Sequence, residues 1–518
     1  MPSSQIDYNE KLAFSSLEKS LWEAADKLRK NIDAAQYKHV VLGLIFLRHM
    51  SDDFEKFRNI ILEGKAVPPG TDPEDREIYR RNNVFFMPPL ARWSRIATMA
   101  RDPKIGGIID EAMELIEAEN PSLTGVLSKI YDRQHLDPAC LGGLVALVGN
   151  ISLGEAKNRS ADLLGHVFEY FLGQFALGEG KKGGQFYTPR SIVELLVEMI
   201  EPFKGKVYDP CCGSGGMFVQ SEAFVTSRSH KRNDISVYGQ ESNQTTWRLA
   251  RMNLAIQGID SSNVVWNSEG SFLNDAHASL IADYILANPP FNDSDWSGDR
   301  LRFDERWQYG IPPSANANFA WLEHIIHHMA PNGHAGIVLA KGTLTSKASN
   351  EGDIRRRMIT EGNLVDCIVN LPPKLFLNTQ IPATMWILAK NRKDPRYRDR
   401  RNEILFIDAR DCGDLITRRT RVFLHNDIEL IAGTYHEWRN HGGQYQDVRG
   451  FCRSASFENI RQLDYVLTPG RYVGLADDEA EFDFKDRFLS LREELKSQIE
   501  REENLNAVIL ESLERIKF

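Results

Sequence analysis

Cysteine is scarce in this sequence of 518 residues, and its spacing excludes two kinds of site. The six cysteines, at positions 140, 211, 212, 367, 412 and 452, show no C-x-x-C spacing. We therefore expect neither a disulfide framework nor a zinc site. The histidines from His277 onward show no metal-binding spacing either, and His324, His327 and His328 are interpreted as capping or surface groups on a helix. The sequence predicts no metal site.

Long apolar runs, a phosphate loop and an excess of positive charge are also missing. No run approaches the roughly 20 apolar residues that span a bilayer, and Met1 to Ser4 begin no charged segment followed by an apolar one. We expect no signal peptide, no membrane contact and a reduced, cytoplasmic protein. No G-x-x-x-x-G-K-[ST] loop occurs, which argues against ATP-driven work. A net charge of −9 is not typical of a nucleic-acid-binding protein, so any DNA contact must come from local basic clusters or from a partner.

The order of elements predicts three parts. Residues 1–160 show helical spacing with few strand candidates, so we expect an all-α N-terminal domain. Residues 161–474 then alternate strand, turn and helix, which is typical of a doubly wound α/β domain with a largely parallel sheet. Its seven expected strands are 206–209, 236–241, 263–268, 282–287, 335–340, 364–370 and 383–389, and a further run, 404–408, extends or flanks the sheet.

Residues 475–518 form the third part, which is expected to be helical. Its apolar side chains recur every three or four residues, but Gln498, Glu502 and Ser512 interrupt the seam. Such a helix can fold back on its own domain or dock on another subunit. Two basic stretches precede it, 390–401 and 418–421, and are interpreted as solvated loops, with phosphate contact as the functional alternative.

One short stretch, Asn288-Pro289-Pro290-Phe291, follows an expected strand that ends at Ala287. Two consecutive prolines cannot continue a ladder, so the chain must leave the sheet there with a fixed geometry. This places an amide, a carbonyl and an aromatic face at a strand's C-terminal edge, where open α/β sheets bind ligands. The Asn oxygen and a proline carbonyl can accept two hydrogen bonds from one amino group while the aromatic ring stacks on a flat base. Methylation of an exocyclic amine needs these groups.

A second stretch resembles a nucleotide-binding turn. The strand that ends at Asp209 enters Pro210-Cys211-Cys212-Gly213-Ser214-Gly215-Gly216, whose glycines allow a ligand to approach the backbone. The next strand ends at Glu241, a carboxylate suited to the two hydroxyls of a ribose. Cys211 follows a proline, as the nucleophile of cytosine-C5 methyltransferases does, but it lies in the cofactor turn and is interpreted as a packing residue.

Taken together, these motifs resemble those of S-adenosylmethionine-dependent amino-methyltransferases that act on adenine N6. Their order, with Gln185-Phe186-Tyr187-Thr188-Pro189-Arg190 first and Asn288 to Phe291 last, is that of the gamma group of DNA methyltransferases. Residues 21–29 and 33–47 are similar to the N-terminal helical domain of type I restriction–modification methyltransferase subunits. The stretches 316–321 and 467–474 also look like that family, so the resemblance covers most of the chain.

The resemblance implies a methyltransferase fold with the following site. S-adenosylmethionine would lie over the glycine turn, with Asp209 and Thr188 near its methionine group and Glu241 near its ribose. A flipped adenine would stack on Phe291, with Tyr187 a possible second wall, while Asn288 and the Pro289 carbonyl would accept from its amine. Implied partners are double-stranded DNA, a specificity (S) subunit that is shared by two modification (M) copies, and a restriction (R) subunit.

Two features remain open within the resemblance. The gamma group often has an Asp where Ser271 stands, and neither Glu269 nor Asp275 is assigned its role. The loop 292–317 is a candidate lid over the base pocket.

Three functions are therefore carried forward. The leading hypothesis is the modification subunit of a type I complex. The alternatives are a self-sufficient methyltransferase for another planar amine or amide, such as an RNA base or a protein glutamine, and a catalytically silent assembly subunit.

Overall fold

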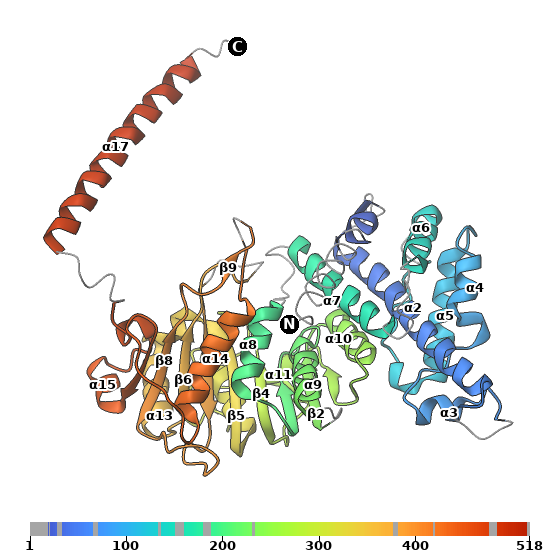
Figure 1. Cartoon of the computed structure of the whole chain (residues 1–518), viewed down its shortest axis with the longest axis horizontal. Coiled ribbons are helices and arrows are strands. Elements are labelled where there is room, and N and C mark those ends of the chain that lie inside the picture. The colour runs from blue at the N-terminus through green and yellow to red at the C-terminus, as the bar shows by residue number, and fades with distance from the viewer. Residues whose placement is uncertain are drawn as a thin grey trace, which may run out of the picture.

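The computed structural model describes residues 19, 21–27, 34–65, 71–132, 136–150, 160–179, 188–229, 234–376, 382–417, 420–475 and 484–514. A group of helices at one end adjoins a large twisted sheet with helices on both faces, and one long helix stands apart (Figure 1). Among the described residues, no helix is long and apolar enough to cross a membrane.

The N-terminal part is helical, as its periodicity predicts. Its helices include α2 (Ala34–Leu62), α3 (Arg76–Arg81), α4 (Trp93–Thr98), α5 (Ile105–Glu119) and α6 (Pro138–Gly149). Helix α7 (Ser160–Glu179) begins at the predicted boundary of this part and packs in the same core. Helix α2 is buried over most of its middle and packs along α7, because its apolar residues surround most of its circumference. Asp137 caps α6 by accepting a hydrogen bond from the Ala139 N–H (3.0 Å), and Pro138 occupies the first helical position.

The sheet has nine strands in the order β11-β8-β6-β7-β5-β4-β1-β2-β3. Their bounds are β1 (Gly205–Asp209), β2 (Ile235–Glu241), β3 (Val264–Trp266), β4 (Ala282–Ala287), β5 (Met329–Ala340), β6 (Val365–Asn370), β7 (Ala383–Ala389), β8 (Glu403–Asp408) and β11 (Cys452–Ser456). All seven predicted strands are present, and the run 404–408 joins the sheet as β8. Strand β11 was not predicted, because its sequence Cys-Arg-Ser-Ala-Ser is short and mostly polar. Strands β7 and β11 are antiparallel to their neighbours, and the others run parallel.

Each face of the sheet has its own hydrophobic cluster, which confirms the doubly wound fold. Helices α8 (Arg190–Ile200), α9 (Gly216–Ser229), α10 (Gln244–Ile256) and α14 (His425–Arg439) pack on one face. Helices α12 (Asn318–His328), α13 (Glu351–Thr360) and α15 (Phe457–Gln462) cover the other. Alternate residues of β5 enter the two clusters: Val338 faces the first, and Ile337 and Leu339 face the second. The order in which successive strands are added reverses between the parallel strands β1 and β4, and ligands bind at such a switch point.

Helix α10 joins the helical part to the sheet. Leu249 and Met252 of this helix belong to the core of the N-terminal helices. On its exposed side, Arg248 Nε donates to the Gly125 carbonyl (2.9 Å) and Arg251 Nη2 donates to the Ser122 carbonyl (2.6 Å). The helical part is therefore held against an element that also borders the switch point.

Two expectations from the sequence are wrong. His324 and His328 are not surface groups but are fully buried, because the loop 292–317 covers the polar side of α12. The first basic stretch is not simply a solvated loop, because Arg392 and Arg400 are buried with Asp366 (2.8 and 3.1 Å). Residues 418 and 419 of the second stretch lie outside the described residues.

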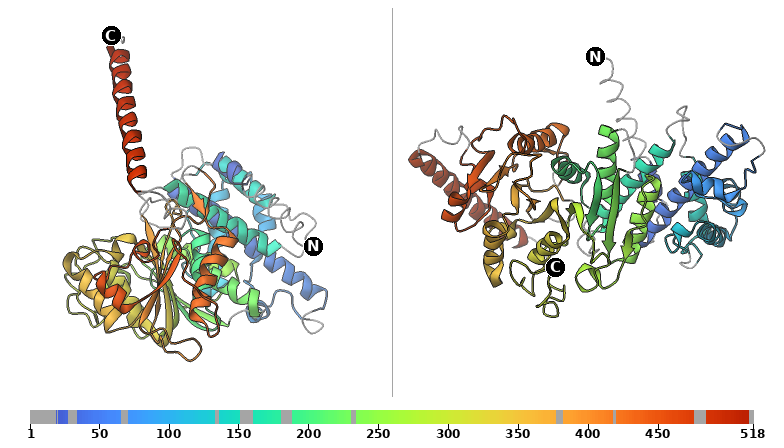
Figure 2. Two further views of the ribbon diagram at one scale, coloured as in Figure 1. Left: turned by 60° about the vertical axis from the view of Figure 1, so that its left-hand side comes forward. Right: turned by 90° about the horizontal axis from the view of Figure 1, so that it is seen from below.

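The C-terminal helix α17 (Phe484–Glu514) does not fold back on the sheet. It stands away from the rest of the molecule in Figure 1 and in the left view of Figure 2. Large apolar side chains along it are about half exposed: Phe488, Leu491, Leu495, Ile499 and Leu505.

Candidate active site

A cavity of about 490 Å³ opens at the C-terminal ends of β1, β2 and β4. The predicted site residues that line it are Thr188, Arg190, Asp209, Gly213, Ser214, Gly216, Glu241, Asn288 and Pro290. The cavity lining does not include Pro189, Gly215, Pro289 or Phe291. Gln185, Phe186 and Tyr187 lie outside the described residues. The structure thus gathers into one place residues that are up to a hundred positions apart in the sequence.

The glycine turn between β1 and α9 leaves open space above its backbone. Gly213 (φ +55°) and Gly215 (φ +80°) adopt backbone conformations that other residues rarely take. A Cβ at Gly213 or Gly216 would have no atom within 4 Å, whereas one at Gly215 would meet Leu254 at 3.5 Å. Gly213 and Gly216 therefore form a cradle, and Gly215 allows α10 to pack beneath it.

Asp209 and Glu241, the two strand-end carboxylates, organise this turn. Asp209 is 2% exposed and accepts a hydrogen bond from the Cys211 N–H (3.0 Å). Burial raises the pKa of Asp209 to about 7. Glu241 accepts from the Gly213 N–H (3.0 Å) and from the Asn243 N–H (2.8 Å), and burial raises the pKa of its carboxyl as well. Two carboxylates thus border the cavity where cationic or hydroxyl groups could meet them.

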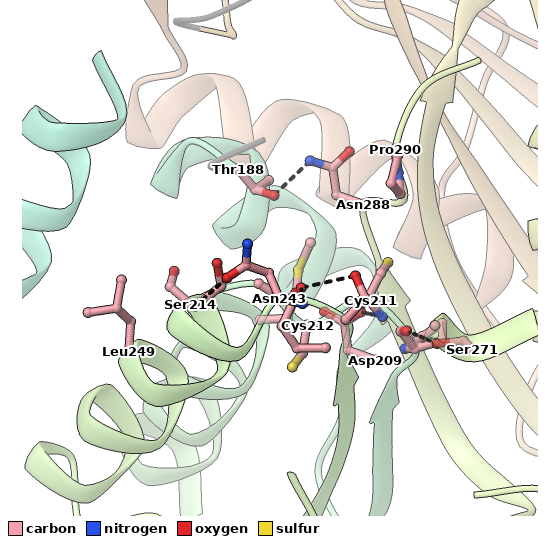
Figure 3. A pocket seen from close by; sticks show the side chains of 18 of the residues that line it. Thr188, Asp209, Cys211, Cys212, Ser214, Asn243, Leu249, Ser271, Asn288 and Pro290 are labelled. Atoms are coloured by element: carbon pink, nitrogen blue, oxygen red, sulfur yellow. Dashed lines mark hydrogen bonds between the residues drawn. The ribbon is translucent and has the colours of Figure 1, made fainter. Parts of the chain in front are cut away.

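Asn288 is fixed by a residue from the predicted cofactor motif. Its Nδ2 donates to Thr188 Oγ1 (2.8 Å), and Figure 3 shows the two side chains turned toward one another, with Pro290 beside Asn288. The residue is 9% exposed, and its Oδ1 is a buried acceptor with no hydrogen-bond partner among the described residues. Buried polar atoms are nearly always paired, so this oxygen is an acceptor for a donor that lies beyond the described residues.

Phe291 has a different setting from Asn288 and Pro290, which line the cavity. Its ring is buried against Phe376, with ring centroids 5.7 Å apart at an interplanar angle of 77°. Sequence reasoning missed Phe376. It follows β6 at the same edge of the sheet, and that position was the signal that could have found it.

The residue at the position of the expected Asp has a structural partner instead. Ser271, in the short helix α11 (Gly270–Leu273), lines the cavity and donates to the Pro210 carbonyl (2.5 Å). Arg306 pins the same helix, because its Nη1 donates to the Ser271 carbonyl (3.1 Å) and its Nη2 to the Phe272 carbonyl (2.6 Å). The loop 292–317, which carries Arg306, also places residues such as Trp296 in the cavity wall.

Cys211 lines the cavity but is unsuited to nucleophilic attack. Burial, reinforced by the charge of Asp209, raises the pKa of its thiol well above the usual range. The thiolate is the reactive form, so the interpretation of Cys211 as a packing residue agrees with its surroundings.

Asp275, His324 and His328 bring three possible metal ligands together. The histidine nitrogens, however, have other partners. His328 Nδ1 contacts the Leu280 carbonyl (2.8 Å) and Nε2 contacts Asp275 Oδ2 (2.9 Å). His324 Nδ1 faces the Arg306 guanidinium (3.1 Å), a cation that would repel a metal ion. The hydrogen bonds of His324 and His328 therefore form a network that connects α12 to the segments beside the cavity.

Comparison with known proteins places this geometry in a family. Residues 159–481, more than half of the chain, match the family model described as N-6 DNA Methylase, and residues 17–148 match the model described as HsdM N-terminal domain. The methylase subunit of the type I restriction enzyme HindI from Haemophilus influenzae is 45% identical over 447 residues, which cover 82% of this chain and 99% of that protein. The corresponding subunit of MjaIX from Methanocaldococcus jannaschii is 37% identical over 522 residues, with 97% and 91% covered.

A solved structure agrees with these relatives. The type I restriction–modification system methyltransferase subunit from Streptococcus thermophilus superposes with a TM-score of 0.73 at 26% identity, covering 89% of this chain and 99% of that one. The chain therefore belongs to the N-6 DNA methylase family and, within it, to the type I restriction enzyme methylase subunits.

Proposed function

We propose that this chain transfers a methyl group from S-adenosylmethionine to N6 of an adenine that is flipped out of double-stranded DNA. The observation that carries the proposal is that Asn288 lines the cavity and that its Oδ1 has no hydrogen-bond partner among the described residues. An exocyclic amine would satisfy this acceptor, while the bond to Thr188 holds the amide in the orientation that presents its oxygen. An amine inside the base stack cannot be reached, so the base must leave the duplex.

The residues around the glycine turn fit the cofactor. Gly213 and Gly216 leave room for it, and in this proposal Asp209 would pair with its ammonium group and Glu241 with its ribose hydroxyls. When bound, S-adenosylmethionine supplies the electrophilic methyl group. Asp209 and Thr188 belong to opposite sides of the same cavity, so the methionine end would lie between the turn and Asn288.

The chain's own contribution is positioning and electrostatics. Asn288 Oδ1 and the Pro289 carbonyl accept from the target amine and direct its lone pair toward the methyl group. Phe291, together with Phe376, supplies the aromatic surface at the base pocket, and the ring of Phe291 must turn from its edge-on contact with Phe376 to lie flat on a base. No residue forms a covalent intermediate.

We further propose three functional parts: residues 1–160 as a helical domain, 161–474 as the methyltransferase domain and 475–518 as a docking segment. The exposed apolar side chains of α17 support docking, because Leu491, Leu495, Ile499 and Leu505 present an apolar surface that is too long to leave in water. The net charge of −9 suits an enzyme that borrows its DNA contact from a specificity subunit. Two copies of this chain on one specificity subunit, with a restriction subunit in the full complex, complete the proposed assembly.

The test is transfer of labelled methyl groups to unmethylated genomic DNA, with the chain alone and with its specificity subunit. We expect label on adenine N6 only when both proteins are present, and at least about a hundredfold loss with Asn288→Ala, the scale of loss when a group that stabilises the transition state is removed. Asn426→Ala, which alters an exposed asparagine in the first turn of α14 and outside the cavity lining, serves as the matched control. Label on RNA or protein, or none at all from a folded complex, would overturn the proposal.

A further inference from the structure

A short hairpin projects beyond the edge of the large sheet. It is made of β9 (Asp414–Leu415) and β10 (Arg421–Val422), which pair antiparallel. Beyond the paired strands, the Ile416 N–H donates to the Thr420 carbonyl (3.0 Å). Figure 1 shows this hairpin rising above α14. It belongs neither to the large sheet nor to the cavity lining.

The base of the hairpin is joined to the segment that follows β6. The Arg421 N–H donates to the Lys374 carbonyl (2.9 Å). Two residues after Lys374 comes Phe376, whose ring packs on Phe291. Only a short stretch of backbone therefore separates the hairpin from the two aromatic rings of the proposed base pocket.

A second contact joins the hairpin to the start of α8. Phe423 directly follows β10, and its N–H donates to Ser191 Oγ (3.4 Å). Ser191 is the neighbour of Arg190, which lines the cavity and has a half-exposed side chain. A residue that is both in the lining and half exposed marks the mouth of the cavity. The hairpin is thus fixed at this mouth on two sides.

The hairpin is exposed and basic, whereas the cavity below it is acidic. Leu415 and Ile416 are 53% and 60% exposed. Residues 414–422 contain three arginines and one aspartate, a net charge of +2 in a chain whose total is −9. Among the described residues, the cavity lining has two basic side chains against six carboxyl groups, those of Glu169, Asp209, Glu241, Glu269, Asp293 and Asp295. Positive charge therefore lies beside the mouth, where a polyanion that cannot enter the cavity would pass.

The nucleotides next to a flipped base stay in the duplex, so the duplex must lie against the mouth of the cavity that receives the base. Its backbone carries one negative charge per about 1.7 Å of helix axis, and its major groove admits a two-stranded β-ribbon. We propose that the β9–β10 hairpin binds the duplex beside the flipped adenine. The inference rests on the proposed function and deepens it, because it gives this chain a DNA contact of its own. The contact surface comprises residues 414–417 and 420–422, since residues 418 and 419 lie outside the described part of the chain.

A protein partner is the other class of molecule that exposed apolar side chains attract. The basic charge of the hairpin and its place at the mouth favour DNA. Substitutions of opposite charge at one exposed residue separate the two classes, because DNA repels one charge and attracts the other, whereas an apolar protein contact is weakened by both.

The experiment compares Ile416→Glu with Ile416→Lys in the complex of the full-length chain with its specificity subunit. The measured quantity is the KM for sheared, unmethylated genomic DNA in methyl transfer, at several salt concentrations. Ile416→Glu should raise this KM about tenfold at low salt, because it places a like charge beside the phosphates, and Ile416→Lys should lower it or leave it unchanged. The difference between the variants should shrink as added salt screens the charges.

Ile281→Glu and Ile281→Lys are the matched controls. Ile281 is 46% exposed and directly precedes β4, so it lies at the edge of the sheet opposite the cavity. Both controls should keep the KM of the unaltered complex. Copurification with the specificity subunit and calorimetry with S-adenosylmethionine check that each variant is assembled and folded. Leu415→Glu and Leu415→Lys repeat the comparison if an Ile416 variant fails to fold.

The possible outcomes separate the inference from the proposed function. If both Ile416 variants keep the KM of the unaltered complex, or if both lose the specificity subunit, the inference is wrong and the proposed function stands. If the unaltered complex transfers no methyl group to adenine N6, the proposed function fails and the inference with it.

Discussion

Asn288, at the end of β4, donates its side-chain amide to the Thr188 hydroxyl across 2.8 Å, although the two residues are a hundred positions apart. The bond determines which way round the amide lies, because the nitrogen is occupied by Thr188 and the buried oxygen is left without a partner among the described residues. A residue of the predicted cofactor motif thereby orients a residue of the predicted catalytic motif. Under the proposed function, this contact would couple cofactor binding to presentation of the acceptor to the target.

The first prediction concerns that contact. Thr188→Val keeps the shape of the side chain but removes the hydroxyl, so the Asn288 amide can rotate and its buried nitrogen loses its acceptor. We expect kcat for methyl transfer to fall about tenfold to a hundredfold, as small misplacements of a reacting group do. Thr188→Ser should restore most of the rate, because it retains the hydroxyl. Equal losses in the Val and Ser variants would show that the methyl group, not the hydrogen bond, is what matters at this position.

The second prediction concerns pH and Asp209. Burial raises the pKa of this carboxyl to about 7, so in the free protein it is protonated below that pH. If the charged form binds the cofactor's ammonium, the carboxyl must lose its proton before binding, and affinity should rise with pH up to about 7. We expect S-adenosylmethionine to bind about tenfold more weakly at pH 5.5 than at pH 7.

Calorimetry in buffers of different ionisation enthalpy measures both the affinity and the proton released. Asp209→Asn should bind weakly at every pH and release no proton from this group. An affinity of the unaltered chain that stays constant between pH 5.5 and 7 would argue against the ammonium contact.

The sequence could predict those features of the fold and the site that depend on short, local patterns of residues. The seven apolar strands and the motifs at their ends are local patterns, and because parallel strands share an edge, their C-terminal residues had to meet. Asn288, Asp209 and Glu241 were predictable for that reason. Their surroundings in space were not predictable. Helix α2 packs against α7 and α10, and no motif in the sequence indicates that packing.

Burial was the other property that the sequence could not supply. Nothing in the sequence around His324 and His328 distinguishes these buried histidines from exposed ones. They are buried because the loop 292–317 covers α12. The basic stretch 390–401 likewise divides into buried and exposed arginines, according to whether each one reaches Asp366. Both outcomes depend on partners that are distant in the sequence.

The third prediction compares a buried and an exposed ion pair of this basic stretch. Asp366 is fully buried between Arg392 and Arg400, and Tyr435 also donates to it (2.7 Å). Asp366→Asn leaves two buried guanidinium groups without their counter-charge, so we expect the free energy of unfolding to fall by about 3–5 kcal/mol. Asp399→Asn breaks the exposed pair with Arg401 and should leave stability unchanged. Chemical denaturation measures both, and similar losses in the two variants would contradict the importance of burial.

The stabilisation that Asp366 provides should also depend on pH. The neighbouring arginines hold the pKa of Asp366 well below its usual value of 3.8. The stabilisation is therefore complete above about pH 4 and is lost as the pH falls toward the folded-state pKa. The stability difference between the unaltered chain and Asp366→Asn should narrow when unfolding is measured at progressively lower pH below 4.

The last prediction concerns the exposed stripe of α17. Leu491 and Leu495 are about half exposed, and neither packs on the sheet. Replacing both with Glu removes apolar surface that a partner helix would bury, but it breaks no contact within the chain. The variant should therefore unfold at the same temperature as the unaltered chain and bind S-adenosylmethionine equally well, yet fail to copurify with the specificity subunit. Glu494→Gln and Lys496→Gln, on exposed positions of the same helix, should preserve the complex. If the double Glu variant still assembles and methylates DNA, subunit docking must use another surface, and the stripe on α17 would need a different partner, such as a second copy of this chain.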